Sequence, residues 1–336
     1  MNPVISLDAY QRARHAAAAI DRSDRGRLVV SGPDRASYLQ GLLTNDIAAL
    51  GPGTGCYAAY LTPQGRMIAD LFLYELGDVL LVTTEGDVKD TVLSRFDQFI
   101  FSEDVRLGDV SDSFAQIAIV GPDAAGVAAD TVGGVAIDAL KALPEHGNVR
   151  ASFGGQPAIV TRVADTGEPG FDVFVDRAAA GAFTAALASR GIVFLDAETA
   201  EALRIEAGVP RFHRDMDEET IPLEAVIEDR AISLTKGCYV GQEVIIRVLH
   251  RGHGRVARKL VKLIVDGDEA PSPGTAIAAA DRAVGRVTSS TISPSLGRPI
   301  ALGYVHRDFT ADGTIVSIDG VRAVVTAAPF TSRGQA

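Results

Sequence analysis

The stretch that decides the fold assignment is Lys236-Gly237-Cys238-Tyr239-Val240-Gly241-Gln242-Glu243. It places the Cys238 thiol close to a lysine and just ahead of an expected helix start, a setting that lowers a thiol pKa and makes the thiol reactive. Its two glycines indicate a backbone that bends sharply or lies close to another group. Cys238 and Lys236 are therefore candidate catalytic residues. The alternative is a tight turn before a helix, with a small buried cysteine.

Composition places limits on the function. The chain has 336 residues, of which 47% are apolar and 22% charged, which is typical of a globular protein of two or three domains. A net charge of −11 argues against nucleic acid as a general partner of the surface. Only two cysteines occur, so the sequence predicts a reducing, cytoplasmic location without a disulfide framework. We find no signal peptide and no apolar run of roughly 20 residues, and therefore expect no membrane partner.

Hydrophobic periodicity predicts an α+β fold with antiparallel sheets, followed by a small β-barrel. Expected strands in the first part are 28–30, 57–61, 67–74, 79–84, 116–120, 158–163 and 171–175. Expected helices are 31–46, 87–100, 177–190 and 196–208. Residues 123–157 show only weak periodicity. From about residue 255 the pattern changes to short strands at 258–265, 284–290, 300–305, 314–318 and 321–326, which indicates a barrel.

The expected domains are an α+β region over 1–250 and a barrel over 251–336. The α+β region is predicted to contain two interleaved subdomains, the second centred on 115–195.

Two carboxylates stand out by their surroundings. Asp70 has apolar neighbours on both faces of its expected strand, and burial there would raise its pKa toward that of a useful general acid or base. Its alternative is a salt bridge to an arginine such as Arg66, or an edge position. Glu206 lies near a helix C-terminus, where the helix dipole opposes a negative charge, so we expect a ligand or a cationic partner. The alternative is pairing with Arg204 or with a neighbouring strand.

The pattern K-G-C-Y-x-G-Q-E resembles the signature of the YgfZ family, folate-binding proteins linked to iron–sulfur cluster assembly and repair. That family is related to the T-protein, the aminomethyltransferase of the glycine cleavage system. Further matches are L-R-x-E-A-G at 203–208, Y-L-Q-G-L-L-T-N-D at 38–46 and the barrel segments 284–289 and 300–305. Together they cover most of the chain from 28 to 305, and imply a T-protein-like multi-domain fold.

The resemblance also implies site residues and a cofactor, tetrahydrofolate or a one-carbon derivative. In T-proteins the matching glutamate holds the pterin ring, a role that falls on Glu206, with Arg204 beside it. T-proteins carry G-x-x-x-D-D where this chain has Gly65 to Asp70, so only Asp70 of the two acids is kept. Asn45 is expected to line the folate pocket.

A basic segment from Lys236 to Lys262 contains Arg247 and only one acid before its end, Glu243. We expect it to attract an anion such as the glutamate tail of folate or an acidic partner protein, although a solvated basic surface is the alternative. The histidines and cysteines do not have the spacing of a metal site, so no metal is predicted.

These observations lead to two hypotheses. The first is a tetrahydrofolate-binding accessory factor for iron–sulfur proteins or their assembly factors, with a functional thiol at Cys238. The alternative is an enzyme, a folate-dependent aminomethyl- or methyltransferase related to the T-protein. The absence of the second acid and the presence of the K-G-C-Y motif favour the first.

Overall fold

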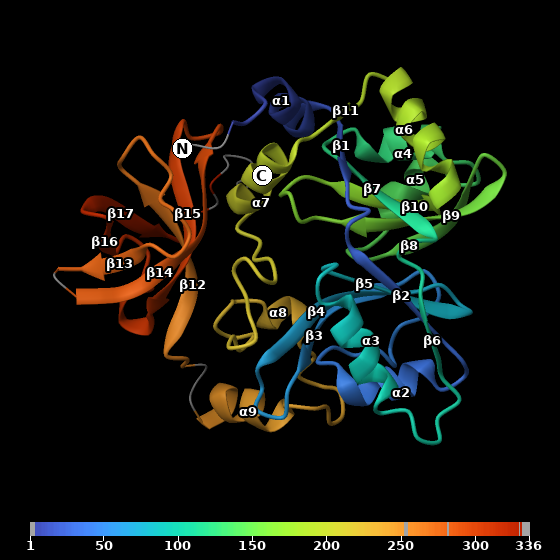
Figure 1. The fold of residues 1–336 in the computed structure, drawn as a ribbon, viewed down its shortest axis with the longest axis horizontal. Coiled ribbons are helices and arrows are strands. Elements are labelled where there is room, and N and C mark those ends of the chain that lie inside the picture. The colour runs from blue at the N-terminus through green and yellow to red at the C-terminus, as the bar shows by residue number, and fades with distance from the viewer. Residues whose placement is uncertain (1–3, 252–254, 281, 329, 331–336) are drawn as a thin grey trace.

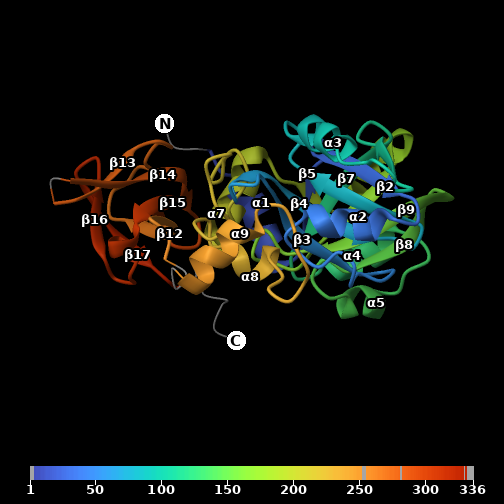
Figure 2. The same cartoon turned by 90° about the horizontal axis from the view of Figure 1, so that it is seen from below.

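The computed structural model describes residues 4–251, 255–280, 282–328 and 330. These residues form two largely antiparallel sheets with flanking helices, in which only β1 and β11 pair in parallel, and a closed barrel that lies to one side of them (Figure 1). Seen from below, the barrel occupies one end of an elongated molecule and both sheets occupy the other (Figure 2). The predicted α+β fold with a C-terminal barrel is confirmed.

The first sheet has five antiparallel strands and supplies Asp70. Its order is β3 (Gly55–Leu61), β4 (Met67–Glu75), β5 (Val79–Thr84), β2 (Gly26–Ser31) and β6 (Arg106–Asp109). Helices α2 (Arg35–Leu42) and α3 (Lys89–Asp97) pack on it through Leu39, Val92 and Phe96, which are buried in the same core. The helix expected over 87–100 is shorter than predicted, because backbone bonds from Phe99 and Ile100 close turns instead of continuing it.

The second sheet has six strands and takes in a piece of the N-terminus. Its order is β11 (Val193–Phe194), β1 (Ala18–Asp21), β7 (Phe114–Val120), β10 (Gly170–Asp176), β9 (Gln156–Val163) and β8 (Asn148–Phe153). Helices α4 (Ala124–Thr131), α5 (Ile137–Ala142) and α6 (Ala180–Ser189) accompany it, the last preceded by a short 3-10 turn, Arg177–Ala179. Strand β1 precedes the first sheet in sequence but pairs with β7 and β11, so the two sheets are interleaved along the chain.

Helix α7 (Ala197–Ala207) lies between the sheets and the barrel (Figure 1). It begins where the Asp196 carboxylate accepts a hydrogen bond from the Thr199 N–H, and it ends at Gly208 with φ 71°, a backbone angle that favours glycine. The sequence predicted both ends. The N-terminal helix α1 (Leu7–His15), which was not predicted, contacts α7.

The barrel closes in the order β12 (Arg258–Val265), β15 (Arg298–His306), β14 (Arg282–Ser293), β13 (Ala276–Ala279), β16 (Ile315–Ile318) and β17 (Val321–Thr326). Strand β13 was not predicted, because an alanine-rich run of four residues has no alternation to detect. A 3-10 turn, Arg307–Phe309, follows β15.

Residues 209–251 connect α7 to the barrel along the first sheet. They contain α8 (Glu228–Ala231), α9 (Gln242–Ile246) and a π-helical turn, Arg247–Arg251. The division into 1–250 and 251–336 stays a prediction, since that boundary adjoins residues outside the described ranges. Within those ranges, no helix has the length and apolarity needed to cross a membrane.

Candidate functional site

Asp70 lies on β4 with its side chain 7% exposed, next to Tyr57 of β3. The register pairs Asp70 with Ala59, so Tyr57, two residues before Ala59, presents its ring on the same face. The Tyr57 hydroxyl donates a hydrogen bond of 2.8 Å to Asp70 Oδ2. Arg66 pairs with Glu219 instead, so the alternative of an Asp70–Arg66 salt bridge is wrong.

The surroundings of Asp70 make it able to exchange a proton near neutral pH. Burial raises the pKa of Asp70 to about 6, and the nearby charge of Glu85 adds to that rise. The hydrogen bond from Tyr57 and the charge of Arg25 act in the opposite direction. A carboxyl group with such a pKa is populated in both forms close to neutrality, which suits a general acid or base.

The pocket beside Asp70 is rich in arginine. Its lining includes the four arginines Arg25, Arg204, Arg211 and Arg230 and the three acids Asp70, Glu85 and Asp165. The pocket itself holds only about 40 Å³, but cavities of about 170 and 380 Å³ adjoin it, and Arg211 lines all three. We call these three spaces the central cleft. In the pocket beside Asp70 the arginines outnumber the acids four to three, which favours an anionic ligand there.

Two of these arginines contact groups that surround Asp70. Arg211 donates hydrogen bonds of 2.9 and 2.6 Å to Glu85, and the Arg230 guanidinium lies over the Tyr57 ring, 5.5 Å from its centroid. Sequence analysis missed Tyr57, Glu85, Arg211 and Arg230. Tyr57 was detectable by pairing the two expected strands. Glu85 follows β5, Arg211 lies in a loop and Arg230 on the short helix α8, and only the tertiary fold brings these three together.

Arg204, a predicted ligand residue, lines the central cleft but is already engaged. Its guanidinium donates to Asp215 at 2.6 Å, to Ser289 of the barrel at 2.9 Å, and to Glu201. These bonds fasten α7 to the segment that follows it and to β14. A role in ligand binding stays a prediction and requires one of these partners to be exchanged.

Glu206, the predicted pterin partner, lies outside the lining of the central cleft and is 1% exposed. Its oxygens accept hydrogen bonds from Tyr10 at 2.6 Å, from the Ser295 N–H at 3.2 Å, and from Arg14 and Ser293. The expected cationic partner exists, but it is Arg14 rather than Arg204. The pterin role stays a prediction, since these contacts must open before a ligand can reach the carboxylate.

Lys236 anchors the 236–243 segment to the end of α2. Its Nζ donates to the backbone oxygens of Gln40, Leu43 and Asn45 at 2.6 to 2.8 Å. Burial lowers the Lys236 pKa to about 8. A cation at a helix C-terminus offsets the negative end of the helix dipole and gives its last carbonyls a donor. The catalytic role predicted for Lys236 stays a prediction, beside this structural one.

Cys238 is exposed, so the alternative of a buried filler cysteine is wrong for it. Cys56 is the buried one, and burial raises the pKa of its thiol to about 12. Helix α9 begins four residues after Cys238 and has only five residues. Of the two glycines, Gly241 has φ 86°, and a Cβ there would lie 2.6 Å from the Thr62 oxygen, whereas Gly237 has no such neighbour. Catalysis by Cys238 stays a prediction.

Two further predicted ligand residues lie elsewhere. Asn45 donates to the backbone oxygens of Tyr57 and Arg230, so it supports the wall of the cleft without lining it. Arg247 pairs with Glu243 on the surface at 2.5 Å. Ligand binding by either residue stays a prediction. In the part of the chain that the structure describes, no group of three or more His, Cys, Asp or Glu is placed to hold a metal ion.

Some basic side chains of the 236–262 segment form contacts within the protein. Arg258 pairs with Glu224, and Lys262 donates to two backbone oxygens near residue 327. His253, which the sequence places in this segment, lies outside the described residues.

Comparisons with known proteins agree along the whole chain. Residues 5–236 match the family model "GCVT N-terminal domain", and residues 258–331 match "Glycine cleavage T-protein C-terminal barrel domain". An aminomethyltransferase of Nostoc sp. is 31% identical over 96% of this chain and 86% of its own length. One of Rubrobacter xylanophilus is 33% identical over 88% of this chain and 78% of its own length.

A solved structure shows the same fold. The crystal structure of glycine cleavage system aminomethyltransferase T from Bartonella henselae superposes with a TM-score of 0.86 at 23% identity, covering 97% of this chain and 89% of that one.

These findings correct the leading hypothesis from the sequence. They support the coarser relationship to T-proteins and not the assignment to YgfZ. The prediction of an accessory factor for iron–sulfur proteins, with iron–sulfur partners, is wrong, because relatives matching almost the full chain are named aminomethyltransferases. The K-G-C-Y motif was given too much weight against matches that extend over both domains.

Proposed function

The chain belongs to the glycine cleavage T-protein family, and from that premise we propose that it is a folate-dependent transferase of an aminomethyl or methyl group. One observation carries the proposal beyond family membership: the buried Asp70–Tyr57 pair at the central cleft. The raised pKa of Asp70 supports proton exchange during group transfer. A cytoplasmic location, consistent with two free cysteines, is part of the proposal.

The side chains of the cleft fit tetrahydrofolate by their chemistry. Carboxylates such as Asp70 and Glu85 can accept hydrogen bonds from the N–H edge of a pterin, and Arg25 and Arg230 can attract the carboxylates of its glutamate tail. When bound, tetrahydrofolate supplies the nitrogen that takes up the one-carbon unit.

The residues of this chain would bind and orient the reacting molecules and exchange a proton with them. Asp70 would hold or release a proton at its carboxyl oxygen, and Tyr57 would fix the orientation of that oxygen through its hydrogen bond. Burial is the main cause of the raised Asp70 pKa, and the negative charge of Glu85, which Arg211 holds in place, adds to it. Burial keeps bulk water from the carboxyl group.

Although the second acid of the T-protein motif is absent, the carboxyl group that lines the cleft, that of Asp70, is present. T-proteins have an acid where this chain has Ala69, and successive residues of a strand point to opposite faces. Ala69 is fully buried in the core cluster that α2 and α3 help to form, whereas Asp70 lines the cleft. This position supports the proposal that Asp70, the acid that is kept, exchanges the proton.

The test combines calorimetric titration of tetrahydrofolate with an assay of one-carbon transfer, using glycine cleavage partner proteins. Wild type should bind and transfer, and Asp70→Asn, which keeps the shape and an acceptor for Tyr57, should bind but lose about 100-fold or more in rate. Arg322→Gln, on the barrel surface, is the matched control and should retain both. Binding without any transfer by wild type would reject the enzyme, and absence of binding would reject the folate site.

A further inference from the structure

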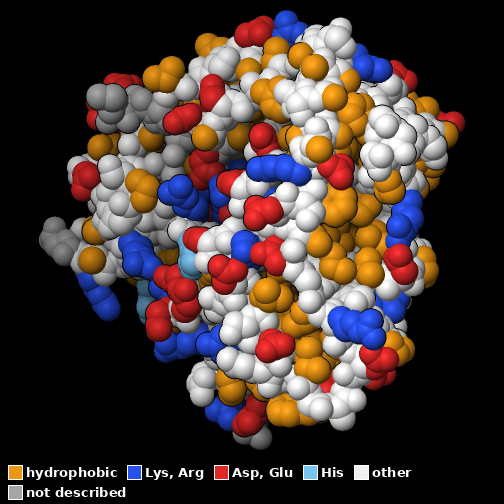
Figure 3. All heavy atoms as spheres, turned by 45° about the vertical axis from the view of Figure 1, so that its right-hand side comes forward, with side chains coloured by type: hydrophobic (Ala, Val, Ile, Leu, Met, Phe, Trp, Pro, Cys, Tyr) orange, Lys and Arg blue, Asp and Glu red, His pale blue; other side chains and the backbone are white. Residues whose placement is uncertain are grey.

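A second cavity lies away from the central cleft, between the faces of the two sheets. It has a volume of about 570 Å³, within the range of small-molecule sites. None of its lining residues lines the central cleft. Figure 3 shows apolar side chains gathered in a band on the face turned toward the viewer.

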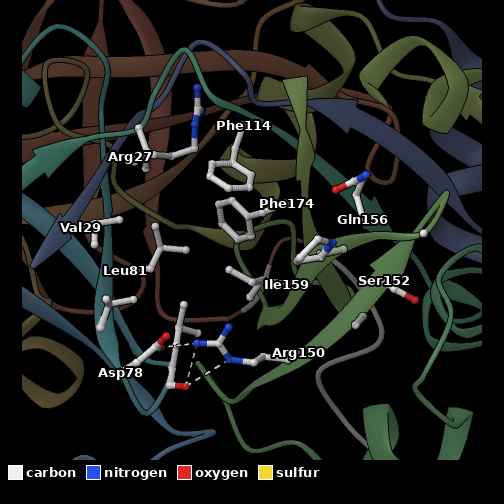
Figure 4. A pocket seen from close by; sticks show the side chains of 17 residues that line it. Arg27, Val29, Asp78, Leu81, Phe114, Arg150, Ser152, Gln156, Ile159 and Phe174 are labelled. Atoms are coloured by element: carbon white, nitrogen blue, oxygen red, sulfur yellow. Dashed lines mark hydrogen bonds and ion pairs between the residues drawn. The ribbon is translucent and has the colours of Figure 1, made fainter. Parts of the chain in front are cut away.

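Two cross-strand pairs face each other across this cavity. Val29 of β2 is paired with Leu81 of β5 on the first sheet, and Ile159 of β9 with Phe174 of β10 on the second. All four point into the space shown in Figure 4, with Phe114 above Phe174. The sheets approach each other where Phe174 meets Tyr74, with ring centroids 6.4 Å apart. Leu76, Leu81 and Phe174 form one hydrophobic cluster with Tyr74, so the cavity opens beside the contact between the two sheets.

Charged groups mark two opposite sides of the cavity (Figure 4). On one side Arg27 is 1% exposed, and its Nη atoms donate to backbone oxygens, at 3.0 Å to Ser23. Its Nε is buried without a hydrogen-bond partner among the described residues. On the other side, Arg150 pairs with Asp78 and donates through Nε and Nη2 to the Leu76 oxygen. Two guanidinium groups and one carboxylate leave a net positive lining.

From this geometry we propose that the cavity is a binding site for a small aromatic molecule carrying one anionic group. The branched and aromatic side chains would hold the apolar body, because enclosing it removes apolar surface from water on both sides. Arg150 is the recognition group for the anion, since it lies at the exposed rim and the bonds described above leave its Nη1 available. Asp78 competes with that anion for Arg150. The site is independent of the proposed transferase activity.

Two dyes of matched shape test the proposal on the full chain. Anilinonaphthalene sulfonate has an aromatic body with one anionic group, and phenylnaphthylamine has the same rings without it. Both should bind wild type saturably at one site with enhanced fluorescence, the sulfonate more tightly. Val79→Phe and Val29→Phe narrow the cavity, and each should weaken both dyes about tenfold or more. Val321→Phe, on a half-exposed barrel strand, is the matched control and should change neither.

Charge variants separate recognition from simple adhesion to an apolar surface. Arg150→Gln should weaken the sulfonate and leave the neutral dye unchanged, and Asp78→Asn should strengthen the sulfonate alone. Circular dichroism and thermal unfolding establish that each variant is folded, and the two independent Val→Phe positions keep the test valid if one fails to fold.

The proposal is overturned if binding is not saturable, if both folded Val→Phe variants bind like wild type, or if Arg150→Gln affects both dyes equally. Tetrahydrofolate should not displace either dye. Displacement would place the dye in the central cleft and would also overturn the proposal.

Discussion

Arg14 of α1 and Glu206 of α7 form an ion pair that is almost completely removed from solvent, with side-chain exposures of 7% and 0%. The pair joins the N-terminal helix to the last turn of α7, and Ser293 of β14 completes it from the barrel. Three parts of the fold that are distant in sequence therefore meet at one carboxylate. A negative charge near a helix C-terminus is unfavourable, and the positive charge of Arg14 offsets this cost.

We expect Glu206→Ala to destabilise the protein by about 3 kcal/mol, because buried Arg14 keeps Glu168 but loses its second counter-charge, and Tyr10 and Ser293 lose their acceptor. Urea denaturation followed by circular dichroism measures the change. The double variant Arg14→Met with Glu206→Ala should lose less than the sum of the two single variants, since the two charges act together. An additive double-mutant cycle would show that the two residues do not act as a pair.

Asp70 should lower the stability of the fold at neutral pH. Its pKa is about 6 in the folded protein against 3.8 in the unfolded chain, so the folded state binds the proton more tightly. The stability that the fold gains by binding this proton is fully present below pH 3.8 and is lost as the pH rises through 6. A rise of that size corresponds to roughly 3 kcal/mol. Asp70→Asn should thus be more stable than wild type at pH 7 by up to this amount.

The stability difference between Asp70→Asn and wild type should fall toward zero as the pH approaches 4. Urea denaturation at pH 4.5, 6 and 7.5 gives the curve, and Asp8→Asn on the exposed face of α1 is the control. A difference that does not change with pH would contradict the raised pKa. Loss of transfer together with gain of stability would identify Asp70 as a residue kept for activity.

Lys236→Met should cost about 2–3 kcal/mol, because three backbone oxygens at the end of α2, one buried and two partly buried, lose this donor. Lys236→Arg should recover part of this. If the lysine is only an anchor, Lys236→Met assayed well below its unfolding temperature should transfer the one-carbon unit at nearly the wild-type rate. A loss of 100-fold in rate in the folded variant would instead establish the predicted catalytic role.

Local signals in the sequence predicted much of the fold. Asp196 and Gly208 mark the ends of α7 because a side-chain cap and a positive φ are local requirements. Strand β1 was missed because its four residues pair only with strands about 100 or more positions later. The elements within residues 123–157 were not placed because this alanine- and glycine-rich segment carries weak periodicity. Helix α1 was missed although Ala9, Tyr10 and Ala13 give it a buried face.

The site was harder to predict than the fold. Asp70 was recognised from its apolar surroundings alone, but its partner Tyr57 depends on strand register, and the arginines around it come from separate segments. Arg204, two residues away, and a neighbouring strand were the alternative partners of Glu206, whereas the ion pair forms with a residue 192 positions earlier. Proximity in sequence is a poor guide to the partner of a buried charge, because burial is decided by packing between distant elements.

The two cysteines should differ sharply toward thiol reagents. Cys238 is exposed, whereas Cys56 is buried with a pKa raised to about 12, so almost no thiolate forms there at neutral pH. With iodoacetamide at pH 7.5, intact mass spectrometry should show one adduct on native wild type, two in denaturant, and none on native Cys238→Ser. Two native adducts at similar rates would mean that the β3 region opens easily. If labelling of Cys238 leaves tetrahydrofolate binding and transfer unchanged, its thiol takes no part in the proposed reaction.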